Sequence, residues 1–590
     1  MTYRHFKYEG WLYVLAFLIA LSVRLLHLGA MPLTDAEAAP ALQALRLSQS
    51  LRPSLDPHPF YIFSTTLLFL FYGGGTNFLA RLIPALMGSL LVLAPSLLDD
   101  RLKPRPSVIL AFFLALDPGL VAISRQIGSP ILAITFLAFT VGFINKQRLH
   151  WAAVTAAFAL LSGPSIWFGL LGLGITFALD QLFKTRAEKP VTELIAEKQE
   201  TSESKSTDEA ATEKDEKPET TVPQPAKFAI QSSVWITFAA AFLIAGTFLF
   251  TAPGGIGAAF SSIPAFFSAW VTSSKITPGM VLLSLVVYQP FVLLLTVIAL
   301  VRGWSRGLRR IVFLSIWMFI ALLLVVFMTS REMSDLAWML IPLNAIASLE
   351  LVRYFHVFPD ERREVLGVIL LTAFIWVFAW LGMTGINWLP FNAPDYGVRA
   401  GMMVGSLLLL ALSLILVSAG WSIRIARLGG VWGLAIGLGA LSLSGMFGTT
   451  AMRGMDSPEL WWLPNMPVQA ELLRDTVSQV SDIGMGNIHS ADVAILGVQS
   501  PSLEWALREN PVRVVDALDP LNAPDFVVTS NEMNPELASA YRGQDFVWRQ
   551  SPAWEVADFS GWLRWVSLRE MPQNQEMIIL WARSDLFLDE

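Results

Sequence analysis

The stretch WLYVLAFLIALSVRLLHLGAMPLTDAE, residues 11–37, decides the class of this protein. It opens with an apolar run from Trp11 to Gly29, and about 20 such residues are enough for a helix to cross a bilayer. Comparable runs recur as far as Phe447, in a chain that is 54% hydrophobic and only 15% charged, with a mean hydropathy of +0.55. A soluble domain carries about 25% charged residues. The sequence therefore predicts a polytopic integral membrane protein.

The first apolar run could also be mistaken for a signal peptide. It is longer than the apolar core of a signal peptide, typically about 7–15 residues, and it lacks a convincing small-residue cleavage site. We therefore interpret residues 11–29 as a retained first span. The chain has no cysteine, which excludes disulfides, thiolate zinc sites and cysteine nucleophiles.

The loops between the apolar runs indicate the topology, because short loops rich in Lys and Arg mark the cytoplasmic side. Arg4 and Lys7 place the N-terminus inside, and the basic loops at Arg101, Arg302 and Arg424 are further cytoplasmic candidates. The odd number of spans then predicts a multi-pass plasma-membrane protein with a cytoplasmic N-terminus and an extracytoplasmic C-terminal domain. We expect about thirteen spans, at 11–29, 78–98, 107–123, 131–144, 151–162, 165–183, 229–250, 279–301, 311–328, 336–354, 365–385, 399–419 and 430–449.

One apolar run does not fit this scheme. Phe60 to Tyr72 is too short to span comfortably, and counting it as a span would put the basic loop at Arg101 outside. We therefore predict that it forms a helix at the outer membrane surface. It belongs to the first external loop, which runs from Ala30 to about Asn77.

The chain is expected to have four parts, of which the two transmembrane modules, 1–183 and 228–450, are all-α. The first module carries the external loop at 30–77. The segment 184–227 is rich in Glu, Lys, Thr, Ser and Pro, which predicts a disordered cytoplasmic linker, acting as a passive spacer or in regulation. The C-terminal part, 451–590, has nine Arg, no Lys and 21 acidic residues, which argues against nucleic-acid binding.

The C-terminal part also changes its pattern to short apolar runs separated by polar segments. We predict a small α/β domain with strands at Val493–Gly497, Val512–Val515, Phe526–Thr529 and Met577–Trp581, and helices at Leu503–Arg508 and Pro535–Tyr541. Eight of the 21 tryptophans lie here. They are typical of a domain core or a membrane-interface belt, and also of a sugar-binding surface.

The first external loop holds the residues best suited to chemistry. Asp35 and Glu37 stand at the outer mouth of the first span, at the start of a predicted helix. Two interpretations are open at this stage. Asp35 caps the helix while Glu37 complements its dipole, or the two carboxylates face a cavity and act on a substrate. The same loop contains His58-Pro-Phe-Tyr61, and Arg81 follows where the second span begins.

The order of these elements resembles the GT-C glycosyltransferases, closest to the branch of protein O-mannosyltransferases and aminoarabinose transferases. The resemblance covers nearly the whole chain. It rests on Pro32-Leu-Thr-Asp35 with nearby Glu37, His58-Pro-Phe-Tyr61 before a surface helix, Ala80-Arg-Leu-Ile-Pro-Ala-Leu86, Ile123-Ser-Arg125, Tyr288-Gln-Pro290, and Arg331 before Trp338-Met-Leu-Ile-Pro342. The C-terminal stretches Ser502–Arg508 and Leu580–Arg583 resemble an uncharacterised bacterial subgroup of this branch.

The resemblance implies an inverting membrane glycosyltransferase. Such enzymes move a sugar from a polyprenyl phosphate donor to a protein, lipid or glycan acceptor on the outer face. The acceptor needs a base, and the departing phosphate needs positive charge. Asp35 matches the family's acidic position, as base or acceptor-orienting group, and Glu37 is its expected partner. The implied ligands of the donor phosphate are Arg125, Arg331, His58 and Arg81.

Other interpretations of these residues stay open. Each arginine could instead extend toward lipid headgroups. A divalent cation at Asp35 and Glu37 lacks further convergent carboxylates, so we expect no metal and no cofactor.

Three positions depart from the family pattern. Ala36 separates Asp35 from Glu37, where the family usually has adjacent Asp-Glu, while Gly128 replaces a frequent acid and Gly163 a frequent lysine. The alternative function is therefore a catalytically silent GT-C-like membrane protein that binds lipid-linked sugar or glycan. A transporter is disfavoured, because ionisable residues are scarce within the spans and no internal repeat is found.

Overall fold

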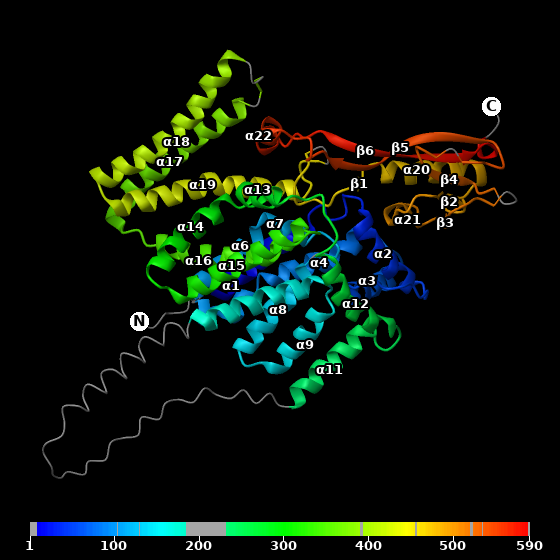
Figure 1. The fold of residues 1–590 in the computed structure, drawn as a ribbon, viewed down its shortest axis with the longest axis horizontal. Coiled ribbons are helices and arrows are strands. Elements are labelled where there is room, and N and C mark those ends of the chain that lie inside the picture. Colours follow the sequence, from blue (N-terminus) through cyan, green and yellow to red (C-terminus); the bar gives the residue numbers. More distant parts are fainter. Residues whose placement is uncertain are drawn as a thin grey trace, which may run out of the picture.

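The computed structural model describes residues 9–102, 104–128, 130–183, 232–386, 388–389, 393–454, 457–519, 523–533 and 535–587. The chain forms a helical body followed by a C-terminal sheet domain (Figure 1). The predicted linker at 184–227 lies outside the described residues.

The body contains the helices of the two predicted transmembrane modules. They are α1 Glu9–Leu25, α2 Asp35–Ser48, α3 Pro59–Tyr72, α4 Asn77–Leu91, α5 Asp99–Leu102, α6 Pro104–Leu116, α7 Pro118–Ile123, α8 Ile131–Asn145, α9 Leu149–Leu160, a helix at Ser165–Phe183, α11 Ser232–Gly246, α12 Gly254–Ser268, α13 Pro278–Tyr288, α14 Pro290–Ser305, α15 Arg309–Phe327, α16 Ala337–Leu351, α17 Arg362–Ile386, α18 Pro394–Gly420 and α19 Ile423–Thr449.

Within the described residues, seven helices are long and apolar enough to cross a membrane. The pair α13–α14 counts as an eighth, although its axis bends by 96° at Gln289-Pro290. Proline lacks the backbone N–H that a continuing helix needs, so it starts a new helix here. Five further helices are apolar but shorter, and one of them is α3, which was predicted to lie on the surface. The all-helical membrane body is confirmed.

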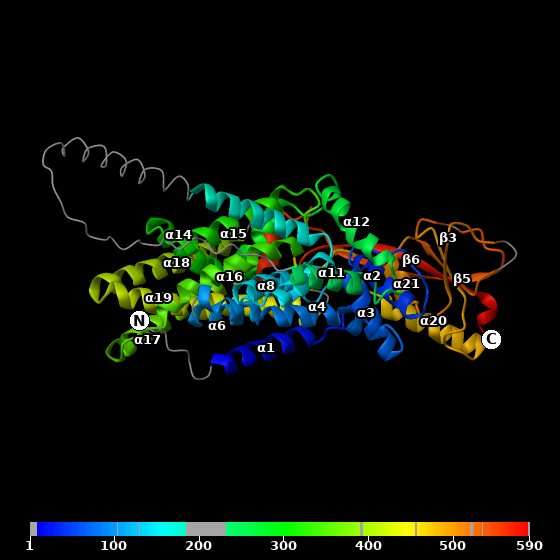
Figure 2. The same ribbon diagram turned by 90° about the horizontal axis from the view of Figure 1, so that it is seen from below.

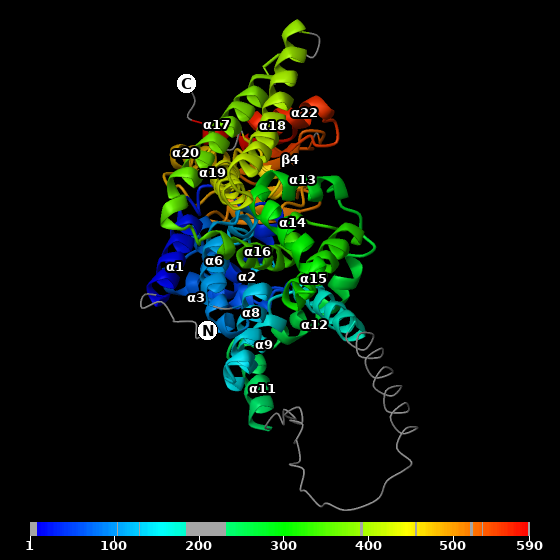
Figure 3. The ribbon, with the colours of Figure 1, turned by 90° about the vertical axis from the view of Figure 1, so that its left-hand side faces the viewer.

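The C-terminal domain lies at one end of the body, next to α2 and α3 (Figures 1 and 2). The helices α17 and α18 form a pair that projects away from the rest of the bundle (Figures 1 and 3). The domain is therefore positioned to cover the loops that emerge at its end of the bundle.

The predicted α/β character of this domain is confirmed, and its sheet has the strand order β1-β5-β6-β4-β2-β3. Strand β2 pairs in parallel with β3 and β4, while the pairs β4–β6, β6–β5 and β5–β1 are antiparallel. The elements are β1 Met466–Pro467, α20 Ala470–Met485, β2 Val493–Leu496, α21 Pro501–Ala506, β3 Val512–Val515, β4 Phe526–Ser530, β5 Tyr541–Pro552, α22 Phe559–Leu568 and β6 Gln573–Arg583.

One predicted helix of the domain is wrong. Residues 535–540 form no helix, and β5 begins at Tyr541. In β5 the polar residues Arg542, Gln544 and Asp545 are exposed, and pairing with β6 supplies the backbone hydrogen bonds. The strand is therefore stabilised by its neighbour rather than by an apolar pattern of its own.

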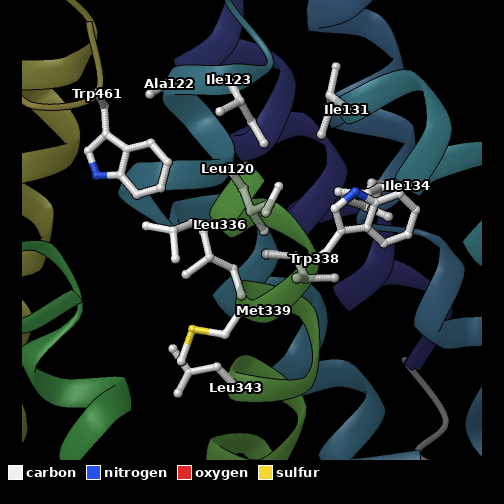
Figure 4. Packing of buried hydrophobic residues seen from close by; sticks show 14 of the residues in the cluster. Leu120, Ala122, Ile123, Ile131, Ile134, Leu336, Trp338, Met339, Leu343 and Trp461 are labelled. Atoms are coloured by element: carbon white, nitrogen blue, oxygen red, sulfur yellow. The ribbon is translucent and has the colours of Figure 1, made fainter. Parts of the chain in front are cut away.

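The core is continuous from the body into the base of the domain. Leu120 lies between Trp338 of α16 and Trp461, which belongs to the segment between α19 and β1 (Figure 4). Both indoles are about 2% exposed. The sheet domain has a second apolar cluster around Trp548 and Phe526. Trp461, Trp505, Trp548 and Trp565 are all buried, as expected of tryptophans in a domain core.

Candidate active site

The first turn of α2 sends its two carboxylates in different directions. Thr34 is the N-cap, with extended backbone angles of φ −71° and ψ 167°. Glu37 reaches back to accept hydrogen bonds from the Thr34 backbone N at 3.3 Å and from its Oγ1 at 3.4 Å. This capping box fixes the start of the helix. Of the two interpretations left open for Asp35, the helix cap is excluded, because Thr34 and Glu37 form the cap.

Glu37 forms a buried ion pair with Arg81 of α4. Arg81 donates from Nε to Oε1 at 2.9 Å and from Nη2 to Oε2 at 2.5 Å, and the two side chains are 6% and 1% exposed. The same guanidinium donates to the carbonyls of Met31 and Pro32 at 2.6 and 3.0 Å. Glu37 also accepts from the backbone N of Ile127. The pair therefore locks α2 to the body.

Arg125 follows α7 and is buried beside this ion pair. Its Nη1 donates to the carbonyls of Arg24 at 2.8 Å and Leu26 at 2.6 Å, at the C-terminal end of α1. Its Nη2 donates to His27 O at 3.1 Å and Thr450 O at 3.2 Å. Carbonyls at the end of a helix lack intrahelical partners. Arg125 satisfies them and ties α1 to the end of α19.

Asp35 points into the C-terminal domain. Its Oδ1 accepts from Ser500 Oγ at 2.7 Å and from Ser502 N and Oγ at 3.0 and 2.7 Å. Its Oδ2 is 2.8 Å from Nε and 2.7 Å from Nη2 of Arg549 on β5. Burial alone would raise the pKa of Asp35, but the hydrogen bonds and the Arg549 charge outweigh it and hold the pKa below its usual range.

His58 lies beside Gly163 and Gly128. A Cβ on Gly163, whose φ is +118°, would lie 2.4 Å from His58 Cδ2, and a Cβ on Gly128 would lie 3.9 Å from Nε2. The imidazole therefore occupies the space that a side chain at position 163 would need, and it is in van der Waals range of position 128. Burial lowers the pKa of His58, and its Nδ1 is buried without a partner in the described structure. Burial therefore favours the neutral form of the ring.

Arg331 joins two loops at the same end of the bundle. Its Nη1 donates to Ile276 O at 2.9 Å and its Nη2 to Val326 O at 3.1 Å, while its Nε is buried without a partner in the described structure. Ser330 and Glu332, on either side, line a large cavity, whereas Arg331 is not among the lining residues. The guanidinium therefore lies just behind the cavity wall.

This cavity, of about 540 Å³, lies between the body and the C-terminal domain. Asp35 is on its wall, facing the loops at 273–276 and 330–334 and the segment 458–468. Glu332, Lys275 and Trp462 also line it. A volume of roughly 300–1,000 Å³ with apolar walls and a few polar groups is typical of a ligand site. A second, smaller cavity of about 30 Å³ adjoins it and is lined by Glu37, Arg81 and Arg125.

Tyr288 of the Tyr-Gln-Pro motif fastens the domain to the bent pair α13–α14. Its hydroxyl donates to Glu459 and accepts from the backbone N of Leu460 at 3.0 Å. Glu459 is 2% exposed and also pairs with Arg569 at 3.3 Å and with Arg453 at 3.5 Å. Burial raises the pKa of Glu459 even against the charge of Arg569. The motif thus positions one wall of the cavity.

The structure brings together only some of the predicted site residues. Glu37, Arg81 and Arg125 line the small cavity, Asp35 the large one, and His58 and Arg331 neither. Sequence reasoning missed the partners Ser500, Ser502 and Arg549, and the cavity residues Lys275, Glu332 and Glu459. No local pattern marks the C-terminal partners. The sequence could have singled out Glu332, because it directly follows Arg331 in a short loop.

No protein-family model and no curated protein sequence matches the chain. Among solved structures, the chain is similar to ArnT from Cupriavidus metallidurans bound to undecaprenyl phosphate, with a TM-score of 0.53 and 15% identity over 98% of this chain and 99% of that one. The apo state of the same protein gives a TM-score of 0.51 and 14% identity, with the same coverage.

The Archaeoglobus fulgidus oligosaccharyltransferase, in complex with Zn and sulfate, gives a TM-score of 0.39 and 11% identity, over 88% of this chain and 68% of that one. At these identities the likeness to ArnT is one of fold. The chain is an integral membrane protein with the fold of ArnT, the fold that its sequence resemblance implied.

Proposed function

We propose that this chain is an inverting membrane glycosyltransferase that moves a sugar from a polyprenyl phosphate donor to an acceptor on the outer face of the membrane. The observation that carries the proposal is the cavity of about 540 Å³ between body and domain, on whose wall Asp35 stands. A solved protein of the same fold binds undecaprenyl phosphate. A donor anchored in lipid and an acceptor arriving from water could meet in such a cavity.

The residues divide into positioning and contacting roles. Asp35, on the cavity wall, stays ionised and orients Arg549 and Ser502 of the C-terminal domain. A carboxylate has about four lone-pair sites, and the domain already supplies five donor contacts to Asp35. Glu37, its expected partner, holds Arg81 instead.

Among the proposed phosphate ligands, Arg331 is favoured by its unpartnered Nε behind the wall. Arg81 and Arg125 line the small cavity and bind backbone carbonyls, and burial favours the neutral form of His58. These three residues therefore support the site without neutralising the negative charge of the phosphate.

The proposal includes the thirteen-span topology, the division into the two modules, linker and C-terminal domain, and the placement of that domain outside the cell. The lining segments support it, because residues 35, 275, 332 and 459 all come from the end of the bundle that the loop charges predict to be external. A reporter fused after Arg583 should be accessible from outside intact cells. Protection of that reporter, with labelling only after lysis, would overturn the topology.

A second candidate function is binding of a lipid-linked sugar or glycan without transfer. It is favoured by the same five contacts, which leave Asp35 no free lone pair in this state. Gly128 and Gly163, where the family has charged residues, favour it too.

Transfer distinguishes the two functions. The purified full chain in nanodiscs would be incubated with undecaprenyl-phosphate esters of radiolabelled pentoses and hexoses and an envelope extract as acceptor. We expect wild type to release undecaprenyl phosphate and to label the extract. Asp35→Asn keeps the shape but removes the charge that orients Arg549, and should lower the rate by about 10²-fold, as expected when a group that positions the site is lost.

The matched control is Asp475→Asn, an exposed carboxylate on α20 that pairs only with the adjacent Arg474 among the described contacts. It should keep wild-type transfer. Normal transfer by Asp35→Asn would refute the role of Asp35. No transfer by wild type with any of these donors, together with retained binding of undecaprenyl phosphate, would establish the second candidate instead.

A further inference from the structure

Two neighbouring loops form the wall of the large cavity on the side of the body. Ser274 N donates to Thr329 O at 3.1 Å, and Ser330 N donates to Ala269 O at 3.0 Å, so the segments after α12 and α15 are paired. The Arg331 guanidinium adds a third link, to Ile276 O. The side chains that these loops present to the cavity are therefore held in place from both sides.

Glu332 is the carboxylate that this wall presents. Its side chain is accessible from the cavity that it lines, in a position that the surrounding protein partly desolvates. Its hydrogen-bond partners lie within its own turn, namely Ser334 Oγ at 3.0 Å and the backbone N–H of Asp335. It takes part in no ion pair of the described structure. Its carboxylate therefore keeps lone pairs that a ligand hydroxyl could use.

The other carboxylates of the cavity differ from Glu332 in what they already bind. Asp35 has five donor contacts, and Glu459 is shared between Tyr288 and two arginines. Glu555 lies at the exposed rim, after β5. A group that takes a proton from a substrate must have a lone pair within hydrogen-bond reach of it. Glu332 meets this condition within the cavity.

The charged surroundings of Glu332 also suit a base. Asp335 in the same turn and Arg331 on the preceding position are its neighbours in the chain, and Lys275 stands on the paired loop. Asp35, Glu459 and Glu555 line other walls. Desolvation by the surrounding protein raises the pKa of Glu332 above its usual range. A carboxylate with a raised pKa is a better proton acceptor near neutral pH.

We propose that Glu332 is the general base of the transfer, and that Asp35 is not. This inference rests on the proposed function. The acceptor hydroxyl gives its proton to the Glu332 carboxylate as its oxygen bonds to C1 of the sugar. The bond between C1 and the phosphate oxygen breaks, and its electron pair leaves with the polyprenyl phosphate. The atoms and charges balance without any further reactant, and the attack inverts C1.

The test compares Glu332→Gln with Asp475→Asn, the exposed carboxylate on α20 that lies outside both cavities, in the transfer assay described above. Loss of a positioned base costs about 10²–10⁴-fold in rate. We expect a fall of this size in kcat for Glu332→Gln, with the donor KM within about threefold of wild type. Glu332→Asp should recover part of the rate. Asp475→Asn, which removes a carboxylate outside the cavity, should leave kcat unchanged.

The pH profile separates a base from a structural role. The deprotonated form is active, so log kcat of wild type should fall as the pH drops through the raised pKa of Glu332, and this acid limb should be absent in Glu332→Gln. A Glu332→Gln protein that keeps its kcat and its acid limb would overturn the assignment while leaving the proposed function intact. A wild-type chain that transfers no sugar would overturn both.

Discussion

The two cavities beside α2 differ in how far their charged groups are already satisfied. In the small cavity of about 30 Å³, Glu37, Arg81 and Arg125 are buried and bound to each other or to backbone carbonyls. In the cavity of about 540 Å³, Glu332 and Lys275 are exposed and bound to no other element in the described structure. The residues Glu37, Arg81 and Arg125 of the small cavity belong to sequence motifs, and Glu332 of the large cavity lies next to the motif residue Arg331.

This difference separates charge that builds the site from charge that can act in it. A buried ion pair whose groups are all hydrogen-bonded holds elements together, and it offers nothing to a substrate without losing that function. Exposed charge facing a cavity has lost part of its hydration and gained no protein partner, so a ligand can supply the missing contacts. The motif residues Glu37, Arg81 and Arg125 of the small cavity, whose charged groups are all bound, therefore hold the structure of the site in place. We call them the frame of the site.

The largest effect on stability is expected from Arg81→Ala, which breaks the buried ion pair in the small cavity. Removing one partner of a buried ion pair leaves an uncompensated charge and costs about 3–5 kcal/mol. Glu37 would remain buried at 1% exposure, with only the hydrogen bonds from Thr34 and Ile127. We expect a marked fall in the free energy of unfolding, measured by thermal unfolding in nanodiscs.

The control for Arg81→Ala is a more exposed ion pair of α2. Arg46 and Glu504 also join α2 to a distant element, but their side chains are 45% and 23% exposed. Exposed pairs contribute about 0.2–1 kcal/mol, so Arg46→Ala should have a small effect. Equal losses in the two variants would show that the small cavity is not a frame, and the comparison would fail.

The helical body and the strands of the tail could be predicted from sequence because their signals are local. An apolar run long enough to span a bilayer, such as 430–449, needs no partner to be recognised, and the buried strands at Val493 and Phe526 show their apolar side chains directly. The missed strand β5 is mostly polar on its exposed face, so it depends on β6 to be stable as a strand.

Of the site, the sequence could predict single residues but not the partners that they bind. Asp35 was singled out from its place after the first span, but its ion pair with Arg549 joins positions 514 residues apart. Nothing near either residue signals the other. The capping box shows the same limit at short range, because Thr34 and Glu37 fit a capping pattern that the presence of a second acidic residue, Asp35, obscured.

A smaller effect is expected from Arg549→Ala, which frees Asp35 at the edge of the large cavity. A hydrogen bond to a charged group contributes about 1.5–3 kcal/mol, and the side chains here are 18% and 26% exposed, so screening by solvent puts the loss near the lower end. The matched control is Arg513→Ala, whose pair with Asp492 lies in the same domain at 49% and 30% exposure. It should lose less than Arg549→Ala.

The pH dependence identifies the source of this stability. The pKa of Asp35 is depressed in the folded state, so its contribution is complete above the unfolded value, about 3.9 for Asp, and is lost as the pH falls through the folded pKa. Without Arg549 the depression is smaller, since only Ser500 and Ser502 remain. The difference in unfolding free energy between wild type and Arg549→Ala should therefore be constant from pH 5 to 7 and shrink below about pH 4. A difference that persists unchanged at low pH would assign the loss to packing of the arginine stem, and Asp35 would then contribute to the frame by shape rather than by charge.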